Sequence, residues 1–279
     1  MLPTAAPEGS PGLAAKLGAL RARVGAFPSA LVCFSGGADS ALVLKVAHDA
    51  LGDRAVAMTA VSPSLAPVER AAAQAFCRIL GVRHVLVETR EQDDPRYAAN
   101  GLDRCYYCKD ELYRVAGTTA RELGLARVLD GFNQDDAGQH RPGRRAALEH
   151  AVDSPLIEAG LAKADVRAIS KDLGLATWDK PSAPCLASRL PPGTEVTPAR
   201  LAQVAAAEEA LRELGFRVFR VRHHEDVARL ELAADELPRL LDDAFRRQVD
   251  DAVRRAGYRF VSVDLQPFRS GRLTLAPMP

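Results

Sequence analysis

The chain has 279 residues, and its 37 lysines and arginines balance 36 aspartates and glutamates to leave a formal charge of +1. With 47% hydrophobic and 26% charged residues, the composition is that of a globular protein, which excludes a mainly disordered chain. The near-zero net charge excludes a protein held to nucleic acid by bulk positive charge.

The sequence contains no export signal that we can identify. It has neither a basic start followed by a long apolar run nor any stretch of about 18 apolar residues. We therefore expect no secretory signal, no transmembrane helix and no membrane partner. The five cysteines are an odd number, which favours a reducing cytoplasm over a disulfide framework.

Strand and helix patterns alternate along the first half of the chain. Residues 1–12 predict a loose tail, 12–26 have helical spacing, and the apolar run 30–34 predicts a buried strand. Helices are predicted over 41–51, 68–80 and 111–123, and strands over 54–61, 83–88 and 127–129. This order predicts an α/β fold with a parallel sheet, and a nucleotide would bind at the carboxyl ends of its strands.

The pattern becomes less regular in the middle of the chain and changes after it. Loop-like stretches at 133–143 and 178–193 flank a helix predicted over 163–173. A helix, two strands, a helix and a strand are then predicted over 198–214, 217–222, 227–232, 242–256 and 258–264. We therefore expect a nucleotide-binding domain over 13–194 with its cysteines in loops, and a small α+β domain over 195–279.

A hexapeptide joins the first predicted strand to the following helix. Its glycines turn the backbone so that N–H groups meet at one point, and the helix start and two hydroxyls add further donors. Such a segment binds phosphate, although a Gly-Gly turn with a capping serine is the plainer alternative. No Gly-Lys-Ser/Thr follows, which excludes a Walker A loop. A bound Mg²⁺ would explain an aspartate in this cradle. The candidate residues are Ser35, Gly36, Gly37, Asp39 and Ser40.

The hexapeptide SGGADS resembles the SGGxDS motif of the PP-loop ATP pyrophosphatases. These enzymes cleave ATP between the α- and β-phosphates and transfer AMP to an acceptor. The resemblance implies that residues 35–40 bind ATP, that Mg²⁺ accompanies it with Asp39 as a ligand, and that AMP and pyrophosphate are released. It implies nothing about the acceptor.

Cys105 and Cys108 form a Cys-x-x-Cys pair, and Cys185 is a third cysteine in a polar, loop-like setting. Cys33 and Cys77 fall within a predicted strand and helix, where cysteine is usually a small buried hydrophobe. The pair could be a redox couple, half of a zinc site or two ligands of an iron–sulfur cluster. Three thiolates can hold a 4Fe–4S cluster with one iron left open, and an incidental pair or a partial zinc site is an equal alternative.

Further segments extend the comparison beyond the loop. They are DRCYYCK, DGFNQDD, RPG, SPL, LAKADVRAISKDLGL, DKPSAPCLASRLPPGTEVT and FRVRHHEDVARLEL. Together with SGGADS they closely resemble the LarE family over residues 35–264. This family consists of ATP-dependent sulfur transferases that build the thiol groups of the nickel-pincer nucleotide cofactor of lactate racemase.

The LarE resemblance implies a two-stage reaction on a small-molecule mononucleotide. ATP adenylates the carboxylates of pyridinium-3,5-biscarboxylic acid mononucleotide, and sulfur then replaces AMP to give thiocarboxylates. Family members with only the equivalent of Cys185 surrender its sulfur, whereas members with three cysteines carry a 4Fe–4S cluster. Cys105 and Cys108 place this chain in the second group.

Several charged and polar side chains complete the expected site. Arg220 and Arg222 alternate along one predicted strand and so share a face, which suits a phosphate group. The resemblance assigns them to the substrate phosphate, and an ordinary solvated strand face is the alternative. The resemblance and proximity in sequence add Cys185, Lys109, Ser188, Arg189 and Asp136 as catalytic candidates, with Glu208 as a further one. His223 and His224 are expected to form a surface pair.

Two other functions remain open from the sequence. Some transfer-RNA thiolases also combine SGGxDS with three cluster cysteines, but they would require a basic RNA-binding surface that is not apparent here. A nucleotide-binding module with a structural metal site is the second alternative. The LarE resemblance also implies a homo-oligomer and a functional link to other enzymes of nickel-pincer biosynthesis, without a nucleic-acid partner.

Overall fold

The computed structural model describes residues 12–137, 142–181 and 184–269, so nearly all of the predicted tail lies outside the described residues. Contacts between residues group the chain into two units. The first unit contains 1–60, 69–89 and 108–180, and the second contains 61–68, 90–107 and 181–279. The division of the chain near residue 194 stays a prediction.

A four-stranded sheet organises the first unit. Its strands lie in the order β3 (Arg83–Glu88), β2 (Ala55–Val61), β1 (Ala30–Cys33), β4 (Arg127–Leu129). The central strand β1 pairs in parallel with both β2 and β4. This arrangement confirms the predicted α/β fold with a parallel sheet.

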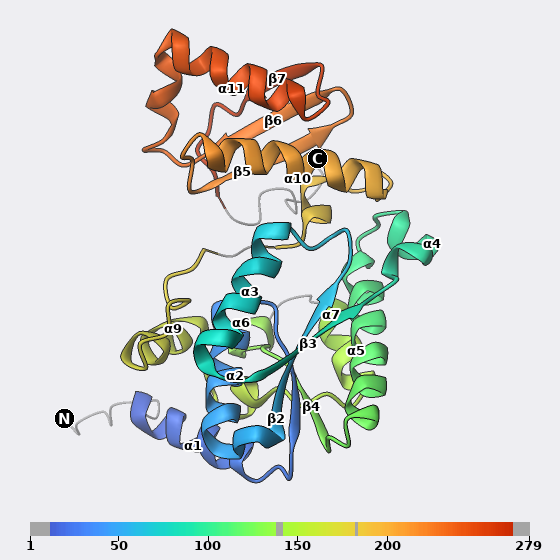
Figure 1. The fold of residues 1–279 in the computed structure, drawn as a ribbon, viewed down its shortest axis with the longest axis vertical. Helices are drawn as coiled ribbons and strands as arrows, with labels where there is room; N and C mark the ends of the chain where they lie inside the picture. The colour runs from blue at the N-terminus through green and yellow to red at the C-terminus, as the bar shows by residue number, and fades with distance from the viewer. Residues whose placement is uncertain (1–11, 138–141, 182–183, 270–279) are drawn as a thin grey trace, which may run out of the picture. The chain divides into compact units, whose positions relative to one another are not determined.

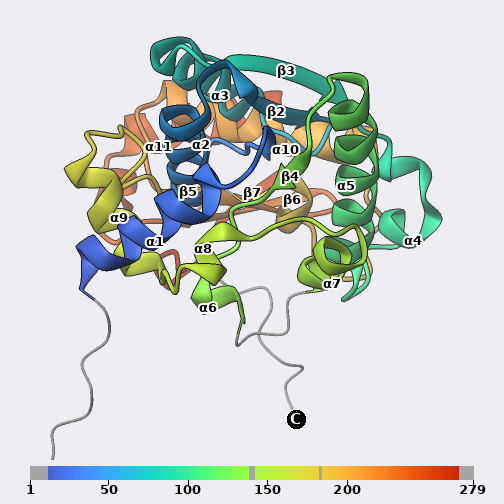
Figure 2. The same ribbon diagram turned by 90° about the horizontal axis from the view of Figure 1, so that it is seen from below.

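Helices cover both faces of this sheet (Figures 1 and 2). Successive residues of β1 point to opposite faces, so that Val32 joins the core on one side and Leu31 the core on the other. The first core is formed with α1 (Leu13–Gly25), α2 (Ala38–Leu51), α3 (Pro67–Leu80) and α9 (Lys163–Asp172), and the second with α5 (Arg104–Glu122). None of the described helices is both long and apolar enough to span a bilayer.

Short helices occupy segments that the sequence predicts as loops. The stretch 133–143 contains α6 (Gln134–Ala137) and the beginning of α7 (Pro142–Glu149), and α8 (Pro155–Glu158) follows it. The expectation that Cys105 and Cys108 lie in a loop is wrong, because α5 already begins at Arg104. Tertiary contacts of the Arg104 side chain, described below, fix this early start.

The second unit contains a three-stranded sheet. Strand β5 (Phe219–His224) pairs antiparallel with β6 (Val227–Leu232), which pairs in parallel with β7 (Phe260–Val263). Side chains of α10 (Pro198–Glu213) and α11 (Asp243–Arg255) pack with this sheet in a separate core. Its remaining elements are α4 (Pro95–Ala98) and the 3₁₀ turns η2 (Glu91–Asp93), η3 (Leu186–Arg189) and η4 (Leu237–Leu241). The expected small α+β domain is therefore present as a fold.

Candidate functional site

The predicted phosphate loop connects β1 to the amino terminus of α2 in the first unit. Gly36 has a φ of 75°, a left-handed conformation that glycine adopts without strain. The hydroxyls of Ser35 and Ser40 lie 3.1 Å apart, and Ser40 Oγ also accepts a hydrogen bond from the Ser35 backbone N–H. Gly37 is the residue before the helix and carries no side chain that could cover its end. The loop therefore has the strand–helix setting of an anion cradle.

Two lysines contact the loop residues, and the sequence did not single them out. Lys180 Nζ donates to the Gly36 carbonyl oxygen (2.9 Å) and pairs with Glu69 (2.6 Å). Lys163 pairs with Asp39, whose other carboxylate oxygen accepts a hydrogen bond from Asn133. Both lysines are far from the loop in the sequence, so only the fold reveals them. Their positive charges suit a polyphosphate at this position.

Gly131 allows a close backbone approach beside the loop. A Cβ atom at this position would lie 2.8 Å from the Ser40 nitrogen and 3.1 Å from the Ser40 Cα. Any side chain would thus push the segment after β4 away from the first turn of α2. Asp136, a predicted catalytic residue, lies in α6 near this segment and accepts a hydrogen bond from the Asn133 N–H (3.1 Å).

Lys109 lies close to buried groups at the carboxyl ends of β1 and β4. Its Nζ is 5.7 Å from the centre of the Tyr113 ring, and the Tyr113 hydroxyl donates to Asp130 (3.1 Å). Burial, and after it the Asp130 charge, raises the pKa of Tyr113 well above its usual value. Burial also raises the pKa of Asp130, although hydrogen bonds and the Lys109 charge oppose the shift. Lys109 is therefore the cation of a buried polar cluster in the first unit.

The second unit positions Cys185 at the start of η3. The Leu186 N–H donates to the Ser64 carbonyl oxygen (2.9 Å), and the Ser64 hydroxyl contacts the buried Tyr97 hydroxyl (2.6 Å). Within the turn, the Ser188 N–H donates to the Cys185 carbonyl oxygen (2.9 Å). The Cys185 side chain remains partly exposed. A fixed backbone thus presents an accessible thiol.

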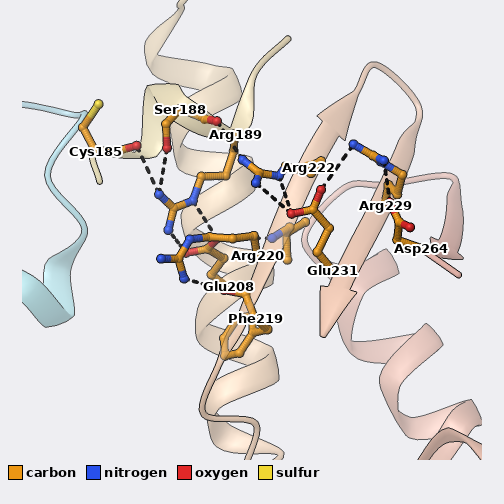
Figure 3. A network of polar contacts seen from close by, with 11 residues as sticks. Cys185, Ser188, Arg189, Glu208, Phe219, Arg220, Arg222, Arg229, Glu231 and Asp264 are labelled. Atoms are coloured by element: carbon orange, nitrogen blue, oxygen red, sulfur yellow. Dashed lines mark hydrogen bonds and ion pairs between the residues drawn. The ribbon is translucent and has the colours of Figure 1, made fainter. Parts of the chain in front are cut away.

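Arg189 anchors this turn from inside the unit (Figure 3). Its Nε and Nη2 donate to the two carboxylate oxygens of Glu208 (2.8 and 3.0 Å), and both side chains are at most 5% exposed. Its Nη1 donates to the carbonyl oxygens of Pro184 (2.6 Å) and Cys185 (3.2 Å) and to Ser188 Oγ (3.0 Å). One guanidinium therefore joins a buried carboxylate on α10 to the backbone around Cys185.

Arg222 forms a second anchor of the same kind (Figure 3). Its Nε and Nη2 donate to the buried Glu231 carboxylate (2.9 and 2.7 Å), and its Nη1 donates to the Ser188 carbonyl oxygen (2.9 Å). Arg220 and Arg222 lie on the same face of β5, opposite the core residue Val221. Arg222 is already bonded to Glu231 and to the turn, so the two arginines have different surroundings.

Arg220 has other contacts than Arg222 on the same strand face. It donates to the Phe219 carbonyl oxygen (2.6 Å), and its guanidinium lies 4.8 Å from the centre of the Phe268 ring. Burial, and after it the charges of Arg189 and Arg222, lowers the pKa of Arg220 to about 10. It is still cationic at neutral pH, in a region where an added anion would be favourable.

The five cysteines fall into two chemical classes. Burial raises the thiol pKa of both Cys33 and Cys77 to about 12, which keeps them protonated and unsuited to bind metal. Cys105 is exposed, and Cys33, Cys108 and Cys185 are partly exposed. Within the described ranges, no three His, Cys, Asp or Glu side chains are grouped to hold a metal ion. The thiols of Cys105, Cys108 and Cys185 fit the donor chemistry of a cluster, and their convergence stays a prediction.

The expectation of a surface histidine pair is wrong for one of the two. His223 is buried, and its Nδ1 lies 3.1 Å from the Tyr258 hydroxyl, whereas His224 is exposed. The alternation of β5 turns His223 toward the core, beside Val221, because Phe219 and Val221 have the same orientation. Its role is therefore in packing.

No family model matches the chain. An uncharacterised protein of Synechocystis sp. is 44% identical over 261 residues, which cover 94% of this chain and 97% of that protein. The pyridinium-3,5-bisthiocarboxylic acid mononucleotide synthase of Lactiplantibacillus plantarum is 38% identical over 262 residues and 94% of each chain. A protein of Methanobrevibacter smithii described as a probable tRNA sulfurtransferase is 28% identical over 72 residues, only 25% of this chain and 19% of its own.

The fold and the loop define the class of protein. A parallel α/β sheet with SGGADS between its central strand and the next helix is the arrangement of a PP-loop domain, here accompanied by a small second domain. The identity to the mononucleotide synthase, sustained over nearly the whole of both chains, narrows this class. The chain belongs to the LarE family of sulfur-transferring enzymes.

Proposed function

We propose that the chain is an ATP-dependent sulfur transferase that converts the carboxylates of pyridinium-3,5-biscarboxylic acid mononucleotide into thiocarboxylates. The observation that carries this proposal is the 38% identity, over 94% of each chain, to the synthase of the corresponding bisthiocarboxylic acid mononucleotide. The residues of both units supply suitable chemistry for its two stages.

In the first stage, the loop of the first unit would bind ATP. Backbone N–H groups of residues 35–40 and the ammonium groups of Lys163 and Lys180 would neutralise the phosphates. Asp39 would be the protein ligand of Mg²⁺, which commonly takes one or two carboxylates together with phosphate oxygens. The substrate carboxylate attacks the α-phosphorus, pyrophosphate leaves, and an acyl adenylate forms.

In the second stage, a sulfur nucleophile attacks the acyl carbon and AMP leaves. Arg220 would bind the substrate phosphate, with Arg222 beside it on the same strand face. Arg189 and Ser188 would hold the backbone around Cys185, and Lys109 and Asp136 are the remaining catalytic candidates. Cys105, Cys108 and Cys185 would hold a 4Fe–4S cluster, which when bound supplies the transferred sulfide at its open iron.

The test is sulfur transfer to the biscarboxylic acid mononucleotide, with AMP, pyrophosphate and thiocarboxylate measured on the same sample. Wild-type protein should release AMP and pyrophosphate only with the acceptor present. Cys185→Ala should lose thiocarboxylate formation and keep ATP binding, and full transfer by this variant would refute its assignment. The buried Cys77→Ala is a matched control that should retain transfer.

Three measurements test the finer parts of this proposal and its alternative acceptor. Anaerobically purified protein should contain about four irons per chain, and Cys105→Ala should lower that content. Full transfer by iron-free protein, accompanied by loss of the Cys185 sulfur, would instead make that cysteine the donor. The short match to a tRNA sulfurtransferase keeps RNA as a competing acceptor, and salt-dependent RNA binding without mononucleotide turnover would favour it.

A further inference from the structure

Asn100 forms a hydrogen-bonded junction that precedes the helix of the Cys-x-x-Cys pair. It is 2% exposed and has a φ of 54°, a left-handed conformation that asparagine tolerates better than most residues. Its Nδ2 donates to the carbonyl oxygens of Pro191 (2.8 Å) and Thr194 (2.9 Å), and its own carbonyl accepts from the Gly193 N–H (3.0 Å). Asn100 therefore fastens the segment before α5 to the chain that follows the Cys185 turn.

Arg104 extends this junction to both cysteines. Its Nη1 donates to Asn100 Oδ1 and to the Ala187 carbonyl oxygen (2.9 Å) in the turn that starts at Cys185. Cys105 is the next residue on α5, and all of these residues belong to the second unit. The guanidinium thus bridges the beginning of α5 and the Cys185 turn.

The electrostatics place both thiols near this guanidinium. The Arg104 side chain is hydrogen-bonded to Cys105, and its charge interacts with the Cys185 sulfur. A guanidinium in this position suits a pair of sulfur ligands. It also remains charged under all physiological conditions.

We propose that Arg104, supported by Asn100, is a positioning residue that holds Cys105 and Cys185 facing each other for sulfur delivery. The arrangement itself is inferred from contacts within the second unit. Its purpose, sulfur delivery, rests on the proposed function. Neither residue is itself a sulfur or nucleotide ligand in the mechanism above. Their task is to bring two cysteines that are far apart in sequence to one place.

The spatial claim is tested by bridging the two thiols in the full-length, iron-free, reduced protein. Dibromobimane becomes fluorescent only after two thiols have displaced its bromides. Cys108→Ser serves as the parent, since Cys108 would otherwise compete, and peptide mapping identifies the bridged pair. We expect rapid Cys105–Cys185 bridging in the parent, and about tenfold slower bridging after Arg104→Leu, as loss of a charge-assisted hydrogen bond implies.

Three companion variants separate positioning from general damage. Arg104→Lys keeps the charge but loses the planar fork, and should bridge at an intermediate rate. Asn100→Gly permits the left-handed backbone and removes only the side-chain bonds, so it should also slow bridging. Arg114→Leu on the exposed side of α5 is the matched control and should bridge like the parent. Far-UV circular dichroism checks folding, and Arg104→Lys and Asn100→Gly decide the outcome if Arg104→Leu does not fold.

The inference is overturned if the parent forms no Cys105–Cys185 bridge, or if the folded Arg104 and Asn100 variants bridge at the parent's rate. Sulfur transfer by the wild-type protein is measured separately. Slowed bridging in the variants, together with a wild-type protein that transfers no sulfur, would support the positioning and refute the proposed function. Sulfur transfer by the wild-type protein, together with unaffected bridging in the variants, would support the proposed function and refute the positioning.

Discussion

The buried pair of Arg189 and Glu208 offers a quantitative test of how the Cys185 turn is held. Glu208 accepts two hydrogen bonds from Arg189 and one from the Val221 N–H (3.2 Å), at 2% side-chain exposure. Arg212 lies 3.7 Å away and would add to an uncompensated positive charge. Removing one partner of such a pair lowers the free energy of unfolding by about 3–5 kcal/mol. Because Glu208→Gln keeps an oxygen acceptor, we expect a loss at the lower end, near ~3 kcal/mol.

The adjacent residue provides the control for this substitution. Glu209 pairs with Arg212 at the surface, where it is 52% exposed. Glu209→Gln should therefore cost no more than about 1 kcal/mol. Urea unfolding followed by far-UV circular dichroism, extrapolated linearly to water, gives both values. Equal losses for the two variants would refute the claim that the buried pair anchors the second unit.

A double variant separates stability from positioning. Arg189→Met with Glu208→Leu replaces the pair by apolar side chains, which often restores the stability that a single charge removal costs. Methionine cannot donate to the carbonyl oxygens of Pro184 and Cys185, so sulfur transfer should stay impaired although the fold recovers. Full transfer by this double variant would show that Arg189 does not position the turn.

Three further predictions concern the first unit and the buried histidine. Lys180→Ala should weaken ATP binding about tenfold or more, as expected for a charge-assisted bond, whereas the surface change Lys171→Ala should not, and calorimetry measures both. Gly131→Ala should lower the free energy of unfolding by about 1–3 kcal/mol, because its Cβ would clash with the first turn of α2. Gly117→Ala has open space in α5 and should be neutral or stabilising, so equal unfolding free energies for the two variants would contradict the prediction. Burial lowers the pKa of His223, so the stability it supports is present above its unfolded pKa and is lost as the pH falls toward the folded value. His223→Gln should flatten stability below about pH 6.5, and an unchanged pH profile would contradict the assignment.

The sequence predicts the sheet and its loop because both depend on local patterns. The apolar run before Ser35 gives β1, and the paired glycines that follow require the turn into α2. The helical start of the Cys-x-x-Cys segment was missed, since its aromatic and cysteine side chains have only modest helix propensity. That start depends on Arg104 and Asn100, whose partners lie more than 80 positions away, with separations of 83 for Ala187 and 91 for Pro191.

The charged residues of the site also divide into features that a local pattern predicts and contacts that only the fold reveals. Alternation along β5 predicts that Arg220 and Arg222 share a face, and the strand has that geometry. No local pattern reveals that Arg222 is bonded to Glu231 or that Lys180 reaches Gly36, because cross-strand register and loop packing decide those contacts. The sequence therefore identifies the residues of the site more readily than the partners that those residues contact.

The two buried ion pairs of the second unit have a common geometric reason. Pro184 and Cys185, directly before η3, have no regular secondary structure, so their carbonyl oxygens need donors from elsewhere. Arginine can meet this need from a distance, since its fork bonds a carboxylate on one side and carbonyls on the other. Arg189 and Arg222 both do so, each fixed by a glutamate that is itself buried. An apolar core could bury the same surface, but it could not hold a polar turn in one orientation. Under the proposed function, Cys185 would have to keep a fixed orientation for the transferred sulfur to reach the activated acyl group.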